Sequence, residues 1–246
     1  MPRTRARTGD YCEAFYRSSG GGHIVNVPLS DLDANAVVQG RPWRTFPWYL
    51  GQKNYAGLYW SATERALVGY ESRLERARLM MLDFDANVNR IGSQPFQLRA
   101  VVAGERISRV PDYLACTTGR ALVVDVKPRR ELSKPDVREV LDLTRRVVES
   151  RGWRYEVLSE PAGVEFSNVR FLAGYRRDWL FDGDRLDAVR SLVRTGETPT
   201  IGQVVAEAQV SRQDALAALF HLLWRQDFVI DISRKIESTS TVQRVS

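Results

Sequence analysis

Apolar residues recur at spacings of three and four between residues 67 and 82, which is the pattern of one buried helix face. The stripe consists of Leu67, Tyr70, Leu74, Ala77 and Met81. Glu71 and Glu75 lie beside it. We expect a helix that ends near Leu82, because the sequence DFDAN that follows favours turns.

The pattern changes to that of β-strands between Val88 and Lys127. Short stretches of β-branched and apolar residues are separated by turn signals, at Gly104 and Glu105 and in the sequence TTGR. We expect these stretches to be adjacent strands of one sheet. Because the TTGR connection is short, the two strands that it joins should be antiparallel neighbours.

A second helix is predicted after these strands. Ser133 can cap it, Pro135 suits its first turn, and Gly152 can end it. Its apolar stripe consists of Val137, Val140, Leu141, Thr144, Val147 and Val148. The sequence WRYEVLS then predicts a strand that the crossover makes parallel to an earlier one. This order of elements indicates an α/β fold.

Helical patterns dominate after Ser167. A short helix, a tight turn and a helix capped near Ser211 precede two β-like stretches, FVIDIS and STVQRV. This order predicts a helical, winged-helix-like C-terminal domain over residues 179–246, after an α/β domain over residues 59–178. Residues 1–58 show no clear periodicity, so we expect an irregular lead-in there.

Composition narrows the class of protein only slightly. The chain has 246 residues, a net charge of +6 and a pI near 9.5, which is compatible with a polyanionic partner. No run of about 18 uncharged apolar residues could span a bilayer, and no apolar stretch follows the N-terminal arginines as in a secretory signal. We therefore expect a cytoplasmic protein without membrane contact. Cys12 and Cys116 are too few for a disulfide framework or a zinc site.

Candidate chemistry lies at the end of a predicted strand, in the sequence ALVVDVKP. Alternation puts Val123, Asp125 and Lys127 on one face of this strand. Asp112 lies on the preceding strand, so both aspartates could reach one metal ion. Hydrolysis of a phosphodiester needs an activated water and neutralisation of phosphoryl charge, which a divalent metal held by carboxylates supplies. These residues indicate a site for Mg²⁺, which prefers oxygen ligands.

Pro111 and Asp112, followed by the sequence DVK at residues 125–127, resemble the PD-(D/E)xK motif of restriction-like nucleases. The sequences SRLE, RLMMLDFD and SQPF resemble, more narrowly, the TnsA-type endonuclease subunits of heteromeric transposases. The likeness extends from about Tyr59 to Tyr175. Within it, LYWSAT, VVDVKP and NVRFLAGYR follow the order and spacing of that family.

This resemblance implies a restriction-endonuclease-like mixed sheet core and a Mg²⁺-dependent DNA endonuclease, with Mn²⁺ able to substitute. It implies Glu75 as a metal ligand on a helix, Asp112 as the acid that reaches both metal ions, and Asp125 as a further acid. Val126 would add its backbone carbonyl to the metal ligands. Lys127 would orient or activate the attacking water.

The resemblance also implies partners. The enzyme would hydrolyse one strand at the 5′ ends of a mobile element, in double-stranded DNA at the transposon ends, and a DDE transposase subunit would cut the 3′ ends. An AAA+ ATPase would regulate both, through a C-terminal domain whose apolar helix has few basic residues for reading a DNA groove. The place of action would be the nucleoid of a bacterial cytoplasm.

Two other hypotheses stay open: a stand-alone restriction, defence or repair nuclease with the same site, and a non-catalytic DNA-binding or assembly protein. Glu71 competes with Glu75, because it lies one helical turn earlier on the same side and only the SRLE match favours Glu75. Arg129 and Arg130 either bind phosphates near the cut or form a solvated loop. Gln94 matches the family without an evident role. Structural or solvated roles are expected for Trp43, Phe46, Trp48, Tyr49, Asp83, Asp85 and Trp153.

Overall fold

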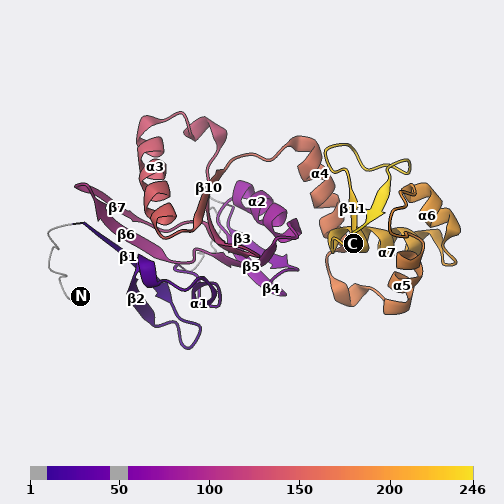
Figure 1. Cartoon of the computed structure of the whole chain (residues 1–246), viewed down its shortest axis with the longest axis horizontal. Helices are drawn as coiled ribbons and strands as arrows, with labels where there is room; N and C mark the ends of the chain where they lie inside the picture. The colour runs from indigo at the N-terminus through magenta and orange to yellow at the C-terminus, as the bar shows by residue number, and fades with distance from the viewer. Residues whose placement is uncertain (1–9, 45–54, 246) are drawn as a thin grey trace. The chain divides into compact units, whose positions relative to one another are not determined.

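The computed structural model describes residues 10–44 and 55–245, which form a mixed α/β structure with several sheets and, among these residues, seven α-helices (Figure 1). The chain forms two compact units. The first comprises Met1–Leu79 and Asn87–Glu160, and the second comprises Met80–Ala86 and Pro161–Ser246. The main division therefore follows Glu160, earlier than the boundary at residue 178 that the sequence suggested.

The sheet that carries the candidate residues has the strand order β10-β9-β8-β5. Its strands are β5 (Val88–Ser93), β8 (Tyr113–Thr117), β9 (Ala121–Val126) and β10 (Arg154–Leu158). The antiparallel pairing of β8 with β9 confirms the prediction from the short TTGR connection. The parallel pairing of β9 with β10 confirms the predicted crossover.

A second four-stranded sheet has the order β2-β1-β6-β7. Its strands are β1 (Tyr11–Arg17), β2 (Ile24–Pro28), β6 (Gln97–Val102) and β7 (Glu105–Arg109). The expectation of one sheet between residues 88 and 127 is therefore wrong. The chain leaves the first sheet at Gln94, whose φ of 44° is left-handed, and at Pro95, which has no N–H for a ladder.

The described part of the N-terminal segment is not the irregular lead-in that we expected. β1 pairs antiparallel with both β2 and β6, and its Ala14 is fully buried. A 3-10 turn η1 (Leu29–Asp31) and a short helix α1 (Ala34–Val38), capped by the Asp33 side chain, follow. Sequence periodicity missed these elements because they are short. The aromatic residues Phe46, Trp48 and Tyr49 lie outside the described residues.

The helix predicted from the stripe at 67–82 begins later than expected. The residues at the start of that stripe belong to β4 (Ala66–Tyr70), which pairs antiparallel with β3 (Gly57–Ser61). Helix α2 spans Arg73–Phe84. Its start is set by Ser72, whose Oγ accepts a hydrogen bond from the N–H of Glu75 at 3.0 Å.

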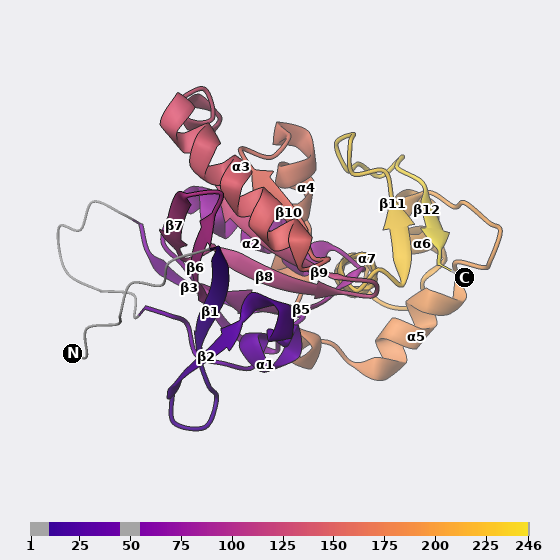
Figure 2. The same cartoon turned by 60° about the vertical axis from the view of Figure 1, so that its left-hand side comes forward.

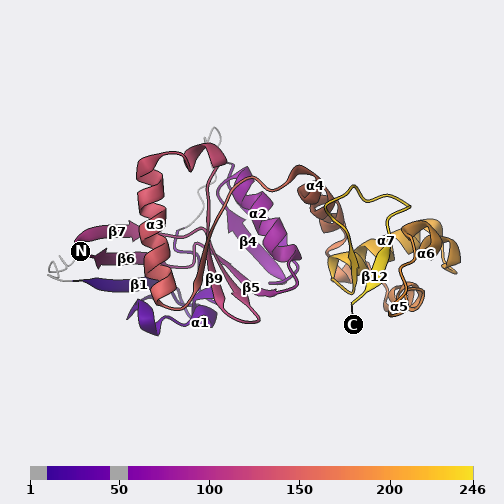
Figure 3. The same ribbon diagram turned by 45° about the horizontal axis from the view of Figure 1, so that its top comes forward.

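Helix α3 (Pro135–Ser150) follows the short turn η2 (Arg129–Glu131). Its N-cap is Lys134 rather than the expected Ser133, whose Oγ instead donates to the carbonyl of Arg130 at 3.0 Å. Its apolar stripe packs into the core of the first unit with side chains from β8, β9 and β10. Figure 2 shows α3 crossing these strands, and Figure 3 shows β9 between α3 and α2.

The second unit is mainly helical. Its elements are α4 (Gly163–Leu172), η3 (Ala173–Tyr175), η4 (Asp178–Leu180), α5 (Gly183–Ser191), α6 (Ile201–Glu207), α7 (Arg212–Trp224), β11 (Phe228–Ile230) and β12 (Val242–Arg244). Helix α7 contacts α4, α5, α6 and β11. Ser211 caps α7, as the sequence predicted. The two β-like stretches contain β11 and β12, which pair antiparallel.

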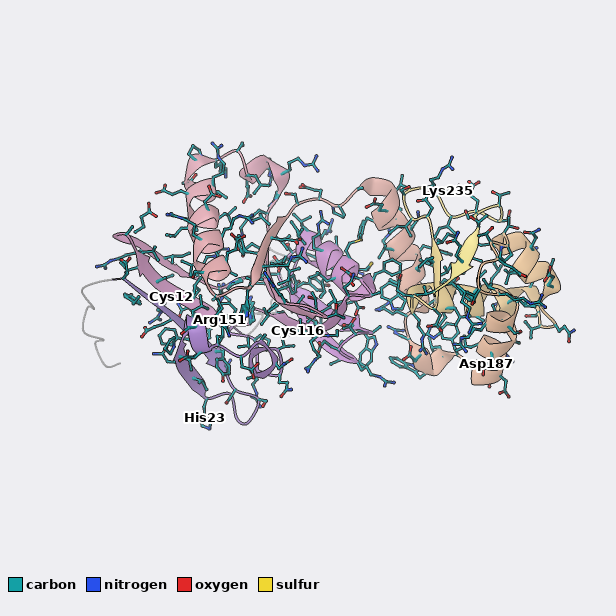
Figure 4. All side chains as sticks on the ribbon, in the orientation of Figure 1. Cys12, His23, Cys116, Arg151, Asp187 and Lys235 are labelled. Carbon is teal, nitrogen blue, oxygen red and sulfur yellow. The ribbon has the colours of Figure 1, made fainter. Side chains whose placement is uncertain are left out.

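The loop between β11 and β12 is attached to α4 by one side chain. The buried Asn168 donates to the carbonyls of Ile232 and Arg234 at 2.9 and 2.7 Å, and its Oδ1 accepts from the N–H of Ile236 at 3.4 Å. Figure 4 marks Lys235 on this loop. The amide of Asn168 therefore satisfies three backbone groups of a segment that is neither helix nor strand.

Two further features bear on the class of protein. Cys12 on β1 and Cys116 on β8, both marked in Figure 4, are free thiols. Across residues 10–44 and 55–245, no helix combines the length and the apolarity that a membrane span requires.

Candidate metal-dependent active site

Asp112 lies beside the end of β9 that carries Asp125. It immediately precedes β8, whose first residue Tyr113 pairs with Val124 of β9. The N–H of Asp112 donates to the carbonyl of Val124 at 3.1 Å, and the N–H of Val126 donates to Asp112 Oδ2 at 2.6 Å. These two bonds hold the backbone and the carboxylate of Asp112 against the strand that carries Asp125.

Asp112 has the most perturbed carboxyl group of this region. Its pKa is raised from 3.8 to about 7, first by burial and then by the nearby carboxylates of Asp125 and Glu75. The backbone N–H of Val126, which donates to Oδ2 at 2.6 Å, and the ammonium group of Lys127 act in the opposite direction. The charges of Glu75, Asp125 and Lys127 therefore all act on the carboxyl group of Asp112.

Glu75 lies in the first turn of α2 and has a second role there. Its Oε2 accepts a hydrogen bond from the N–H of Glu71 at 2.7 Å, while Ser72 caps the N–H of Glu75. Burial raises the pKa of Glu75, and Lys127 lowers it. The SRLE sequence is thus a variant of the capping box, a signal that was visible in the sequence beside the family match.

Asp125 is fully buried, and both of its oxygens have partners that sequence reasoning missed. The guanidinium of Arg109, at the end of β7, donates to Oδ1, and the hydroxyl of Tyr155 on β10 donates to Oδ2. Burial and, after it, the charge of Asp125 raise the pKa of Tyr155, so its hydroxyl keeps its proton. No local pattern could have linked these residues, because three different strands bring them together.

The end of β9 is held by its neighbour β10. The N–H of Lys127 donates to the carbonyl of Leu158 at 2.9 Å, and Ser159 Oγ donates to the carbonyl of Lys127 at 2.8 Å. Val126, the last residue of β9, has a buried side chain. The backbone that carries Asp125, Val126 and Lys127 is therefore rigidly placed.

Gln94 acquires a physical role that the sequence did not reveal. Its N–H donates to the carbonyl of Asp112 at 2.8 Å, and its own carbonyl accepts from the N–H of Trp43 at 2.8 Å. Its side-chain Oε1 accepts from the N–H of Arg44 at 3.1 Å. These bonds hold the left-handed backbone of Gln94 and connect the Asp112 strand to the N-terminal segment.

The residues fit a hard divalent cation in the chemistry of their donors, because all are carboxylate or carbonyl oxygens. They do not yet form a complete ligand set: in the part of the chain that the structure describes, no three His, Cys, Asp or Glu side chains group closely enough to hold a metal. The carboxylate of Glu75 is engaged by the Glu71 N–H, and that of Asp125 by Arg109 and Tyr155. Metal binding would require these carboxylates to exchange partners.

Other candidate residues have plainer surroundings. Asp83, which we expected in a solvated or turn position, is buried within α2. Arg129 and Arg130 are exposed in η2, which begins two residues after Lys127. The backbone N–H of Arg129 donates to Glu160 Oε2 at 3.0 Å, which fixes the turn while both guanidinium groups face solvent.

A scan against models of protein families found no match for this chain, and a search of curated proteins found none either. The resemblance to TnsA-type subunits therefore stays a prediction from the sequence. The contact of Asp112 with the end of β9 and the charges that act on its carboxyl group are what support a functional proposal.

Proposed function

We propose that this chain is a Mg²⁺-dependent DNA endonuclease with a restriction-like core in its first unit. The observation that carries this proposal is the position of Asp112, whose carboxylate accepts from the N–H of Val126 and whose pKa is raised by burial and by the carboxylates of Asp125 and Glu75 and lowered by Lys127. A carboxyl group held at such a raised pKa needs a cation to ionise fully at neutral pH. A divalent metal is the cation that phosphodiester hydrolysis also requires.

The ligands that we propose for the metal are the carboxylates of Glu75, Asp112 and Asp125 and the carbonyl of Val126. When bound, the metal would neutralise charge on the phosphoryl oxygens and lower the pKa of a coordinated water. Lys127 would hold the attacking water through its ammonium group, on the same face of β9 as Asp125. Burial of Asp112 strengthens each of these electrostatic interactions because little water screens them.

We also propose that this endonuclease is a subunit of a transposase. The support for this second proposal is the sequence resemblance. The reaction would be hydrolysis of one strand at the 5′ ends of a mobile element, with a DDE subunit cutting the 3′ ends. The second unit would be winged-helix-like and would bind an AAA+ ATPase. The apolar residues of α7 do not supply that contact surface, because His221 to Trp224 are all buried.

Mapping which DNA strand is cut tests the assignment to a transposase. We expect the full chain, combined with the transposition proteins encoded beside it, to cut the 5′ strand of a labelled transposon end in Mg²⁺. The control is Asp136→Asn, an exposed acid at the start of α3. Cutting of both strands by the chain alone would favour a stand-alone nuclease instead.

A non-catalytic DNA-binding or assembly role is the remaining alternative. The observation that favours it is the engagement of Glu75 in a helix cap and of Asp125 in an ion pair. Under this alternative, substitution of Asp112 or Lys127 would leave cleavage by the assembled complex unchanged. The nuclease proposal requires cleavage to be lost while DNA binding is retained.

A further inference from the structure

A group of polar side chains surrounds the buried Asp125 carboxylate. The Arg109 guanidinium donates to Asp125 Oδ1 through one terminal nitrogen and to Thr144 Oγ1 through the other, at 3.3 Å for the latter. Thr144 Oγ1 in turn donates to the carbonyl of Val140 on α3. Tyr155 completes the group through Asp125 Oδ2. Each oxygen of the Asp125 carboxylate thereby accepts a hydrogen bond from a neighbouring side chain.

The hydrogen bonding of the Arg109 guanidinium group is incomplete. Its Nε is buried and has no hydrogen-bond partner in the described residues, although each of its two terminal nitrogens donates one hydrogen bond. A buried donor without an acceptor costs stability. The side chain also keeps 15% of its surface exposed, whereas Asp125 has none. Arg109 is therefore bound to Asp125 but remains partly exposed to solvent.

The net charge of the side chains around Asp125 also depends on Arg109. Glu75, Asp112 and Asp125 would carry one net negative charge with both Lys127 and Arg109 present. Withdrawal of Arg109 would leave two net negative charges, which a divalent cation neutralises. A carboxylate as buried as Asp125 needs one positive partner at all times, because an unpaired buried charge is strongly destabilising.

We propose that Arg109 is an internal counter-cation that competes with the divalent metal for Asp125, so that the site loads fully only when Arg109 withdraws. This inference rests on the proposed function, since it takes Asp125 as a metal ligand. Arg109 stands three residues before Asp112 in the chain and ends β7. A shift of the segment between them on DNA or partner binding would release Asp125 and so couple metal loading to assembly.

Direct titration of Mn²⁺ tests the competition without any cleavage reaction. The dissociation constant is measured on the full chain by the electron paramagnetic resonance signal of free Mn²⁺. Arg109→Gln removes the charge but can still donate one hydrogen bond to Asp125, and we expect it to bind Mn²⁺ roughly 10-fold more tightly than the wild type. Arg109→Lys keeps a charge but cannot reach both partners, and roughly 3-fold tighter binding is expected.

Arg106→Gln is the matched control, since Arg106 lies on the same strand and is exposed. Its Mn²⁺ affinity should equal that of the wild type. Equal or weaker binding by both Arg109 variants would overturn the inference and leave Arg109 as a structural partner only. If Arg109→Gln fails to fold even with Mn²⁺, Arg109→Lys alone decides between these results.

Asp112→Asn distinguishes a failure of the proposed metal site from a failure of the proposed competition by Arg109. Loss of Mn²⁺ binding in this variant, with no effect of the Arg109 substitutions, would refute the competition while leaving the metal site intact. Unchanged Mn²⁺ binding in Asp112→Asn would refute the metal site itself, and with it the competition. Tighter binding on Arg109→Gln that Asp112→Asn abolishes would support both.

Discussion

Asp112 occupies an unfavourable position for an ionised carboxyl group. It is largely buried, and the carboxylates of Asp125 and Glu75 both lie within electrostatic reach. One backbone N–H and the ammonium of Lys127 offset only part of this cost. Such an arrangement stores destabilisation at a site where a bound cation would relieve it, as functional sites often do.

This position has a consequence for stability. The folded-state pKa of Asp112, about 7, lies above its ordinary value of 3.8, so folding favours the protonated form. The contribution of this carboxyl group to stability is fully present below about pH 4 and is lost as pH rises through 7. Asp112→Asn mimics the neutral group and can still accept from the N–H of Val126. It should raise the free energy of unfolding at pH 8 by about 1–3 kcal/mol.

Urea unfolding at a series of pH values, without divalent metal, measures this effect. The stability difference between Asp112→Asn and the wild type should grow from pH 4.5 to pH 8. A difference that is constant over this range would mean that Asp112 titrates normally in the folded protein.

The short TTGR turn was sufficient to predict that β8 and β9 are antiparallel neighbours, because a turn is a local property of two strands. The common face of Asp125 and Lys127 stays a prediction from strand alternation. Arg109 and Tyr155 could not be predicted in the same way. Each belongs to a strand other than β9, and only the tertiary packing brings both to Asp125. The partners of a buried charge depend on long-range contacts that a single sequence does not display.

At the scale of elements, the start of α2 combines a structural and a proposed chemical role in one residue. The Ser72 hydroxyl and the Glu75 carboxylate each accept a backbone N–H at this helix end. A metal ligand in this place would compete with the cap for the same carboxylate oxygen. Separate substitutions of the two residues can therefore resolve the roles.

Ser72→Ala removes a cap and should lower the free energy of unfolding by about 1 kcal/mol, with little effect on DNA cleavage. Glu75→Gln keeps an oxygen that can accept from the Glu71 N–H, so stability should stay close to that of the wild type while cleavage is lost. Urea unfolding and a Mg²⁺-dependent cleavage assay measure the two properties. Full cleavage by Glu75→Gln would restrict Glu75 to its role in the cap.

The differences between expected and observed elements also have local causes. The spacing of Leu67, Tyr70 and Leu74 fits a helix, but the first two belong to β4, which pairs with β3. Pairing with a distant strand overrode the local pattern, and only the cap at Ser72 indicated where the helix begins. Similarly, the left-handed backbone at Gln94 divides the strands between two sheets, which no apolar pattern could predict.

For the whole molecule, the net charge of +6 makes electrostatic attraction to DNA a testable property. Binding to phosphates releases counterions, so affinity should fall linearly with salt on a logarithmic scale. The exposed side chains of Arg129 and Arg130 lie in η2, which begins two residues after Lys127. They are therefore well placed to contact the DNA backbone beside a cut made there.

Replacing both Arg129 and Arg130 by Ala should reduce the slope of log affinity against log salt by about 1–2, without changing sequence preference. Fluorescence anisotropy of labelled duplex DNA measures this slope. A double variant of Arg170 and Arg194, exposed in the second unit, controls for the change in net charge. Equal slopes for the two double variants would place Arg129 and Arg130 outside the DNA interface.

The most direct test of the proposed nuclease is single-turnover cleavage of end DNA by the assembled complex in Mg²⁺. Asp112→Asn and Lys127→Met are compared with Asp136→Asn, and DNA binding is measured in parallel. We predict that the first two variants bind DNA normally but cleave at least about 100-fold more slowly, while Asp136→Asn cleaves at the wild-type rate. Wild-type cleavage by Asp112→Asn would contradict this prediction.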